Sequence, residues 1–325
     1  MDSKETCMTD IIRLSKQITG SVFIFLLLFT GCNSNVNKKI TDTPTSGTVR
    51  IGIDDSYKLL AEAEIFTFQS FYPDAKIDTI CRPETDILNA FLKDSVSMMI
   101  VNRTLTKEEE QNLNAKQIIP RTLKIAYDAV ALIVNNENPD SNLFYDHIAN
   151  IFQGKIDNWK QINPASKLDQ LKIVFDNFKS GIPRYFREKF LVSKLPPTCF
   201  SVQNNEQVID FVEKNKNAIG VISVNWVSDK ADTVTIRFLK KVKIAGISTP
   251  GTADPRTDFY QPYQAYIAKK IYPFIREVYC INRQTYAGLS YGFTSFIAGS
   301  QGQLIVLHSG LVPATMPVRV VEIKR

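Results

Sequence analysis

The 325-residue chain has only two histidines and five cysteines, and no two cysteines form a Cys-x-x-Cys pair. This scarcity argues against a zinc site, which needs four cysteine or histidine ligands at short spacings. Lysine and arginine are not clustered with aromatic residues, as they would be in a groove that binds nucleic acid. The net charge of only +6 also gives no reason to expect a nucleic-acid partner. We therefore expect no metal, no other cofactor and no nucleic-acid partner.

The N-terminal apolar run is too short to span a membrane as a helix. It covers residues 21–29, about nine residues where a span needs about 20. A basic start, a short apolar core and small residues before a cysteine are typical of a secretory signal. The ending at residues 29–32 (FTGC) resembles a bacterial lipobox, which makes residues 1–31 a signal peptide and Cys32 the lipidated mature N-terminus. The alternative is a buried N-terminal helix that ends in an ordinary cysteine.

The polar stretch of residues 32–48 predicts a flexible tether between the lipid and the folded part. One cysteine is removed with the signal and Cys32 is acylated. The remaining cysteines are Cys81, Cys199 and Cys280. An odd number of cysteines in an exported protein predicts at least one free thiol.

Strand and helix patterns alternate after the tether, which predicts a layered α/β fold with parallel strands. The expected strands cover residues 49–53, 75–80, 98–101, 126–135, 172–175, 219–224 and 275–281. The expected helices cover residues 57–71, about 87–92, 148–152, 180–190, 205–214 and 284–308. The strand at residues 98–101 is apolar throughout, as in a sheet that is covered on both faces.

The strand expected at residues 126–135 is too long for an ordinary sheet member, and the α/β alternation begins again after it. A length near twice 150 residues also favours two globular units. We therefore predict two lobes, with the second inserted into the first through two crossover strands. Lobe 1 comprises residues 49–127 and 283–325, and lobe 2 comprises residues 128–282.

Six segments carry a family resemblance. They are residues 125–135 (IAYDAVALIVN), 151–159 (IFQGKIDNW), 219–224 (IGVISV), 272–276 (YPFIR), 302–313 (GQLIVLHSGLVP) and 316–319 (MPVR). Through these segments the chain resembles the phosphate-type solute-binding proteins of ABC importers, a branch of the type II periplasmic-binding fold. The resemblance implies a monomeric, lipid-anchored receptor on the periplasmic side of a bacterial membrane. Such a receptor captures phosphate or a similar oxyanion between its lobes and passes it unchanged to an ABC permease.

The resemblance also implies which loops contact the ligand: those after the first and third strands, the one before the second helix, and a turn that opens a helix in the second lobe. In this sequence the candidate ligand-binding residues are Asp54, Asp55, Ser56, Arg82, Arg103, Ser180, Gly181 and Arg184. Each has a structural alternative. Ser180 could be a helix N-cap, the two aspartates could form a turn, and two of the arginines could lie on the surface.

Arg184 lies in the first turn of the helix expected at residues 180–190, where exposed amide N–H groups already carry positive partial charge. An arginine beside helix amides is a common oxyanion arrangement, because the guanidinium fork matches two oxygens. We therefore predict that Arg184 faces a bound anion. The alternatives are ion pairs with Glu188 one turn later or with Asp176.

Three positions depart from the family pattern. The second loop, residues 81–85, has no Gly/Ser-rich turn, Ile182 replaces the usual threonine, and Asp176 stands where an arginine is common. These departures leave the ligand open. They motivate an alternative function, a sensor or interaction lipoprotein on the same fold with a changed or lost ligand.

One stretch matches an enzyme motif. Residues 288–292 (GLSYG) fit G-x-S-x-G, the nucleophile elbow of hydrolases, which needs a downstream acid and histidine. His308 is the only later histidine, and no obvious acid lies between it and Ser290. We therefore expect a protein that is not an enzyme.

Overall fold

The computed structural model describes residues 42–228, 233–252, 254 and 256–317, and the fold is given for these residues. The expected signal peptide, Cys32 and the first part of the expected tether lie outside them. No helix in the described part is both long and apolar enough to span a membrane. All three cysteines in this part are free thiols, which confirms the prediction of a free thiol.

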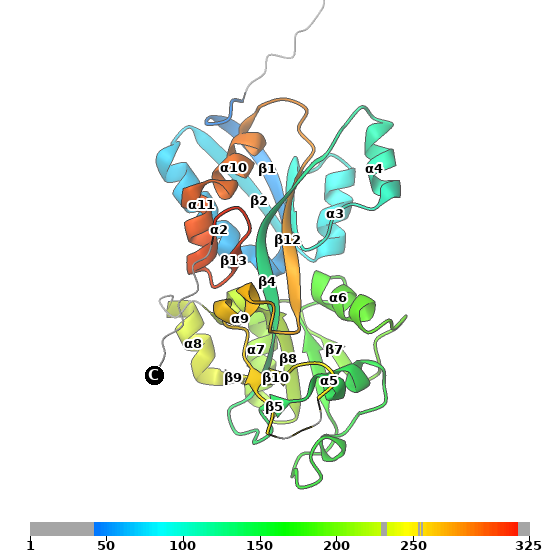
Figure 1. Ribbon diagram of the computed structural model, residues 1–325. Coiled ribbons are helices and arrows are strands. Elements are labelled where there is room, and N and C mark those ends of the chain that lie inside the picture. Colours follow the sequence, from blue (N-terminus) through cyan, green and yellow to red (C-terminus); the bar gives the residue numbers. More distant parts are fainter. Residues whose placement is uncertain (1–41, 229–232, 253, 255, 318–325) are drawn as a thin grey trace, which may run out of the picture. The chain divides into compact units, whose positions relative to one another are not determined.

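One large mixed sheet runs through the described part of the chain (Figure 1). Its main strands, in spatial order, are β2 (Ala75–Arg82), β1 (Gly47–Asp54), β3 (Met98–Val101), β12 (Ile275–Asn282), β4 (Arg121–Asn135), β8 (Ala218–Ser223), β6 (Lys172–Phe175) and β7 (Cys199–Ser201). Two further strands, β9 (Val242–Ile244) and β13 (Val312–Pro313), pair with β4. A small separate sheet contains β11 (Phe259–Tyr260), β10 (Gly246–Ser248) and β5 (Asn142–Leu143).

The strands are parallel at both ends of the large sheet and antiparallel in its middle. β1 is parallel to β2 and β3, and β6 is parallel to β7 and β8. β4 and β12 run side by side in opposite directions. Along the chain, β4 leads from one end of the sheet to the other, and β12 leads back. The two-lobed α/β fold expected from the sequence is confirmed, with a mixed rather than a wholly parallel sheet. The residue bounds of the lobes stay a prediction.

The helices cover both faces of the sheet. They are α2 (Lys58–Phe71), α3 (Glu84–Leu92), α4 (Lys107–Asn114), α5 (Tyr145–Phe152), α6 (Gly181–Lys189), α7 (Asn205–Lys214), α8 (Thr233–Lys241), α9 (Gln264–Ala268), α10 (Leu289–Ala298) and α11 (Ser300–His308). Short 3-10 turns are η1 (Asp55–Tyr57), η2 (Trp159–Gln161) and η3 (Val224–Trp226). We call β1–β3 with α2, α3, α4, α10 and α11 the first half, and β6–β8 with α5, α6, α7 and α8 the second half.

Strand β3 shows how the sequence pattern produces this layering. Its four residues are all buried. Met98 and Ile100 pack into the large core that also contains α2 and α10, whereas Met99 and Val101 pack against α3. Successive side chains on a strand point to opposite faces, so a wholly apolar strand requires a helix on each side. Figure 1 shows α2, α10 and α11 on one side of these strands and α3 and α4 on the other.

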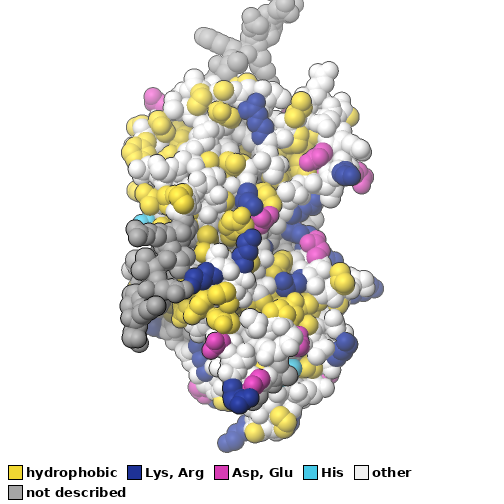
Figure 2. All heavy atoms as spheres, viewed as in Figure 1, with side chains coloured by type: hydrophobic (Ala, Val, Ile, Leu, Met, Phe, Trp, Pro, Cys, Tyr) yellow, Lys and Arg dark blue, Asp and Glu magenta, His cyan; other side chains and the backbone are white. Residues whose placement is uncertain are grey.

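The start of the described chain is held against α10. The Asp42 carboxylate accepts hydrogen bonds from the Tyr286 hydroxyl at 2.6 Å and from the Leu289 amide at 2.8 Å. The last part of the expected tether is therefore packed against the folded part, at least from Asp42 onward. Basic and acidic side chains are mixed over the face shown in Figure 2, and on that face neither sign forms a continuous patch among the described residues.

This packing accounts for the G-x-S-x-G stretch. A Cβ on Gly292 would lie 1.8 Å from the carbonyl oxygen of Pro44, and one on Gly288 would lie 2.5 Å from an Asp42 carboxylate oxygen. Both glycines thus allow the N-terminal segment to approach α10. Ser290 is fully buried, with its hydroxyl 2.6 Å from Gln284 Oε1. In this structure the stretch is a packing site.

Candidate functional site

The N-terminus of α6 faces the first half of the molecule. Its first residue, Gly181, directs its amide toward the Asp54 carboxylate at the end of β1, at 3.4 Å. A Cβ on Gly181 would lie 2.2 Å from Asn102 Oδ1, so only glycine permits this approach. In the adjacent loop, the Lys179 carbonyl accepts from the amide and the hydroxyl of Thr85, at 3.1 and 2.9 Å. The two halves therefore touch at this point.

Arg184 is bound by the chain's own carboxylates. Its Nε and Nη2 donate to the two carboxylate oxygens of Glu84, at 2.7 and 3.1 Å, and Nη2 also donates to Asn102 Oδ1 at 2.7 Å. Its Nη1 donates to Glu188 at 2.9 Å. Burial works against the charge of Arg184, but the hydrogen bonds and charges of the two glutamates raise its pKa.

The group that faces Arg184 is therefore Glu84, where the sequence predicted a bound anion. Glu84 opens α3, and an acidic residue in a first turn interacts favourably with the helix dipole. Arg184 of α6 and Glu84 of α3 thus neutralise each other's charge. The alternative pair with Glu188 forms, whereas Asp176 accepts from the Ser180 hydroxyl at 2.6 Å instead.

Two more carboxyl groups are buried beside the α6 N-terminus. Burial and the neighbouring Glu84 raise the pKa of Asp54 to about 6, and Arg276 acts in the opposite direction. Burial and the Asp54 charge raise the pKa of Asp176 to about 7. Asp54 also accepts from the Ser56 amide at 2.8 Å, so it caps the η1 turn as the structural alternative expected. The centre of the site is acidic rather than basic.

Several buried polar atoms in this region have no hydrogen-bond partner among the described residues. They include Ser56 Oγ, Asn102 Nδ2, Asp176 Oδ2 and Asn205 Oδ1. The first two belong to the first half of the molecule and the other two to the second half. Buried polar groups in folded proteins are nearly always paired. Unpaired donors and acceptors from both halves therefore mark a place for a small polar ligand or for water.

The remaining sequence candidates lie at the margin of this site or point away from it. Asp55 accepts from Asn205 Nδ2 at 2.8 Å and so connects η1 to the start of α7. Arg103 pairs with Glu109 of α4 and donates to the Thr104 carbonyl. Arg82 is exposed, and its side chain has no hydrogen bond or ion pair with the described residues. As ligand contacts, these three stay predictions.

Sequence reasoning missed Glu84, Asn102 and Asn205 as members of the site. Glu84 and Asn102 lie in two of the predicted ligand loops, where the candidate residues were Arg82 and Arg103. An acidic first turn after Pro83 was the available signal for Glu84. No signal in the sequence places Asn205 beside Asp55, because the two lie 150 residues apart.

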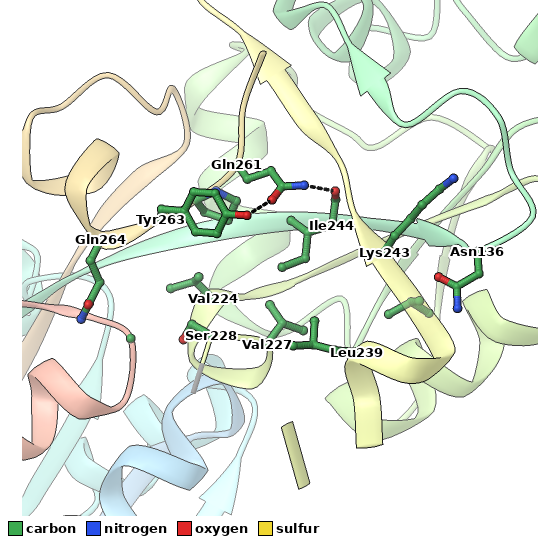
Figure 3. A pocket seen from close by; sticks show the side chains of 13 residues that line it. Asn136, Val224, Val227, Ser228, Leu239, Lys243, Ile244, Gln261, Tyr263 and Gln264 are labelled. Carbon is green, nitrogen blue, oxygen red and sulfur yellow. Dashed lines mark hydrogen bonds between the residues drawn. The ribbon is translucent and has the colours of Figure 1, made fainter. Parts of the chain in front are cut away.

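A separate pocket of about 360 Å³ lies between η3, α8, β9 and the segment before α9 (Figure 3). Its walls are largely apolar, with Val224, Val227 and Leu239 among them. Most of the polar groups at its edge are already paired with described residues, Lys243 being an exception: the Tyr263 hydroxyl donates to Gln261, which donates to the Ile244 carbonyl at 2.9 Å. We therefore place the candidate site at the α6 N-terminus, where polar groups are unpaired. No group of three or more metal-ligating side chains occurs among the described residues.

Comparison with known proteins assigns this chain to a family. Residues 40–301 match the model of the PBP superfamily domain. The chain belongs to the PBP superfamily. It is 28% identical over 155 residues to the phosphate-binding protein PstS of Staphylococcus haemolyticus, covering 47% of each chain. It is 24% identical over 188 residues to PstS of Staphylococcus saprophyticus, covering 58% of this chain and 57% of the relative. The chain spans about half the length of these curated relatives.

Solved structures share the PBP superfamily fold. A Clostridium perfringens substrate-binding protein of a phosphate ABC transporter, solved with bound phosphate, has a TM-score of 0.67 and 22% identity. An ABC-type phosphate transport receptor from Vibrio cholerae has a TM-score of 0.61 and 20% identity. Each match covers 82% of this chain and 100% of the other. At these identities the likeness establishes the fold.

The ion pair between the halves can be tested by replacing Glu84 with glutamine. Because Glu84 is 5% exposed, Glu84→Gln should lower the free energy of unfolding by about 1–3 kcal/mol, the range for hydrogen bonds to charged groups. Glu188→Gln is the matched control, because its carboxylate is exposed and an i,i+4 pair contributes only about 0.3–0.5 kcal/mol. Denaturant titration measures both. Equal losses would show that the pair with Glu84 has no special role.

The raised pKa values predict a pH dependence of stability. The pKa values of Asp54 and Asp176 in the folded chain are about 6 and about 7, against an ordinary value of 3.8. The folded state therefore holds protons that the unfolded state releases, and stability should fall as the pH rises from about 4 to about 7. Burial also raises the pKa of Glu64, to about 9, so a further loss should continue to that pH.

The double variant Asp54→Asn, Asp176→Asn isolates the first of these losses. It should flatten the profile of unfolding free energy between pH 4 and 7 and keep the decline toward pH 9. Asp169→Asn, at an exposed carboxylate, is the control and should retain the whole profile. A double variant with the wild-type profile would contradict the assignment to these two residues.

Proposed function

We propose that this member of the PBP superfamily is a solute-binding receptor that captures phosphate or a similar small oxyanion between its halves and presents it to an ABC permease. The observation that carries the proposal is the set of unpaired buried polar atoms, contributed by both halves, at the N-terminus of α6. Helix N-termini favour anions. The named function of the PstS relatives, phosphate binding, supports the same ligand class.

Hinge closure is the mechanism that this arrangement supports. The described contacts between Lys179 and Thr85 and between Arg184 and Glu84 belong to a closed form. An anion that bonds to groups of both halves stabilises that form over an open one, which shifts the population toward closure. No step changes the ligand chemically, and we propose that the protein is not an enzyme.

We also propose that the protein is exported and lipid-anchored through Cys32. The support is the basic, short apolar and small-residue pattern that precedes this cysteine. Residues 42–46 are held against α10, so a tether that ends there would attach to the first half of the molecule.

The anchor predicts a specific processing product. The native protein should begin at Cys32 and carry more than one acyl chain, because a single chain gives only marginal membrane binding. Cys32→Ser should leave soluble or unprocessed protein. Intact-mass measurement and membrane fractionation test both statements, with Cys7→Ser as the control that should be processed normally. An unmodified Cys32 in the native host would refute the anchor.

A second candidate function is favoured by the acidic side chains. The carboxylate of Asp54 faces the Gly181 amide, and that of Glu84 binds Arg184, so the chain's own carboxylates occupy positions where an anion is expected. A protein that has exchanged its external ligand for internal ones could act as a sensor or interaction lipoprotein on the same fold.

Calorimetry separates the two candidates. The purified chain, freed of lipid, is titrated with phosphate, sulfate and methylphosphonate at fixed salt and at pH 5.5 and 8. The receptor function predicts phosphate binding below millimolar concentration, and stronger binding at the lower pH, where the Asp54 and Asp176 carboxyl groups are more protonated. Absence of binding by all three at millimolar concentration at both pH values would refute oxyanion capture and favour the second candidate.

A further inference from the structure

Another arginine, Arg276, lies buried at the centre of the sheet. It stands on β12 directly opposite Asp128 on β4, where the crossover strands join the two halves. Its Nε donates to Asp128 Oδ2 at 2.7 Å, and the two side chains are 2% and 0% exposed. Its guanidinium also lies over the Tyr57 ring, 5.5 Å from the centroid. The ion pair and the ring together fix the direction of the guanidinium plane.

The other two guanidinium nitrogens of Arg276 are unused. Nη1 and Nη2 are buried and have no hydrogen-bond partner among the described residues. They carry four N–H donors in the planar arrangement that matches an oxyanion. Arg184 differs, because Glu84, Glu188 and Asn102 already accept from its three nitrogens. An oxyanion could bind Arg184 only by displacing one of these acceptors.

Two hydroxyl groups near Arg276 are also unpaired. Tyr185 OH, on α6 of the second half, is buried without a partner among the described residues. Ser56 Oγ, on η1 next to Tyr57, is also buried and makes no hydrogen bond of good geometry with them, although it lies beside the Asp54 carboxylate. The Nζ of Lys189 lies 5.6 Å from the centroid of the Tyr185 ring and 5.8 Å from that of Phe274, two residues before Arg276, so Tyr185 lies on the side of α6 that packs against the start of β12. Burial raises the pKa of Tyr185, and the charge of Arg276 acts in the opposite direction. Arginine can only donate, and both hydroxyls are free to donate. This donor-rich set is suited to a ligand with several acceptor oxygens and negative charge.

We propose that Arg276, together with Tyr185 and Ser56, forms the oxyanion-binding subsite of this chain. Arg184 is then a positioning residue that holds α6 against α3 through Glu84. The inference rests on the proposed receptor function and adds to it the groups that contact the ligand. Because Tyr185 belongs to the second half and Ser56 to the first, an anion bound to Arg276 would connect the halves at the crossover strands.

The test uses inorganic phosphate as the probe and two variants of the full chain. Tyr185→Phe removes only the unpaired hydroxyl. Arg276→Lys keeps a positive charge near Asp128 but removes the two guanidinium NH₂ groups that would bind the anion. Each should weaken phosphate binding in calorimetry by about ten- to a hundred-fold, as loss of charge-assisted hydrogen bonds does. Without phosphate, Tyr185→Phe should melt at the wild-type temperature or higher, because it removes an unsatisfied buried group.

Matched controls exist for both variants. The Tyr272 hydroxyl is buried but donates to the Val130 carbonyl at 2.8 Å, so Tyr272→Phe should lower stability without lowering affinity. Arg283 is a buried arginine that pairs with Asp94 and lies 5.7 Å over the Phe91 ring, away from this subsite. Arg283→Lys should likewise leave phosphate affinity unchanged.

The outcomes separate the inference from the proposed function. If the wild-type chain binds none of the oxyanions, the receptor function fails and the subsite fails with it. If wild type binds phosphate and Tyr185→Phe binds equally well, the subsite is overturned while the receptor function stands. Should Arg276→Lys fail to fold, Tyr185→Phe against Tyr272→Phe decides alone. Weaker binding by Tyr185→Phe at an unchanged melting temperature supports the proposal, since a merely structural role would not produce it.

Discussion

A buried ion pair between Asp128 and Arg276 joins the two crossover strands on which the rest of the sheet is built. Both charges are desolvated, and such a pair is stable only when further hydrogen bonds satisfy its remaining atoms. Asp128 meets this condition, because the hydroxyls of Tyr57 and Ser223 also donate to it, at 3.2 and 2.9 Å. Arg276 does not, since two of its nitrogens are unpaired. The buried polar atoms of this ion pair that lack a hydrogen-bond partner among the described residues are therefore on Arg276 rather than on Asp128.

Closure of the halves depends on a different balance of charge. Around the α6 N-terminus lie three carboxyl groups, those of Asp54, Glu84 and Asp176, and Arg184 pairs with only one of them, Glu84. The excess is tolerable because burial keeps the pKa values of Asp54 and Asp176 near 6 and 7, so that protons neutralise part of it. The same groups that let the halves approach below neutral pH repel one another above it. Stability is therefore coupled to pH by Asp54, which the sequence selected as a candidate ligand contact, and by Asp176, which it marked as a departure from the family pattern.

The fold was predictable because most of its elements bury a periodic apolar pattern. β3, β6 and α7 begin and end at the expected residues. Helix α4 was missed because Leu113 is its only buried side chain, although the Thr106 and Glu109 capping box marks its start. For the site, the sequence indicated which loops contribute to it but not which side chains pair with one another. That Arg184 would meet Glu84, 100 residues away, depends on how closely the two halves approach, which no local pattern encodes.

The two arginines show why residue type and position alone do not identify an anion site. Arg184 occupies a helix start, the place that favours an oxyanion in sequence reasoning, yet three acceptors of the chain satisfy it. Arg276 lies near the start of strand β12, in the buried centre of the sheet, a position that suggests a structural role, yet it retains unpaired donors. An anion gains the most binding free energy from donors that have no other partner. Folding has already removed water from such donors, so binding does not have to supply the free energy of their desolvation. By this criterion the free fork of Arg276, rather than the occupied fork of Arg184, is where a bound oxyanion would contribute most to closure.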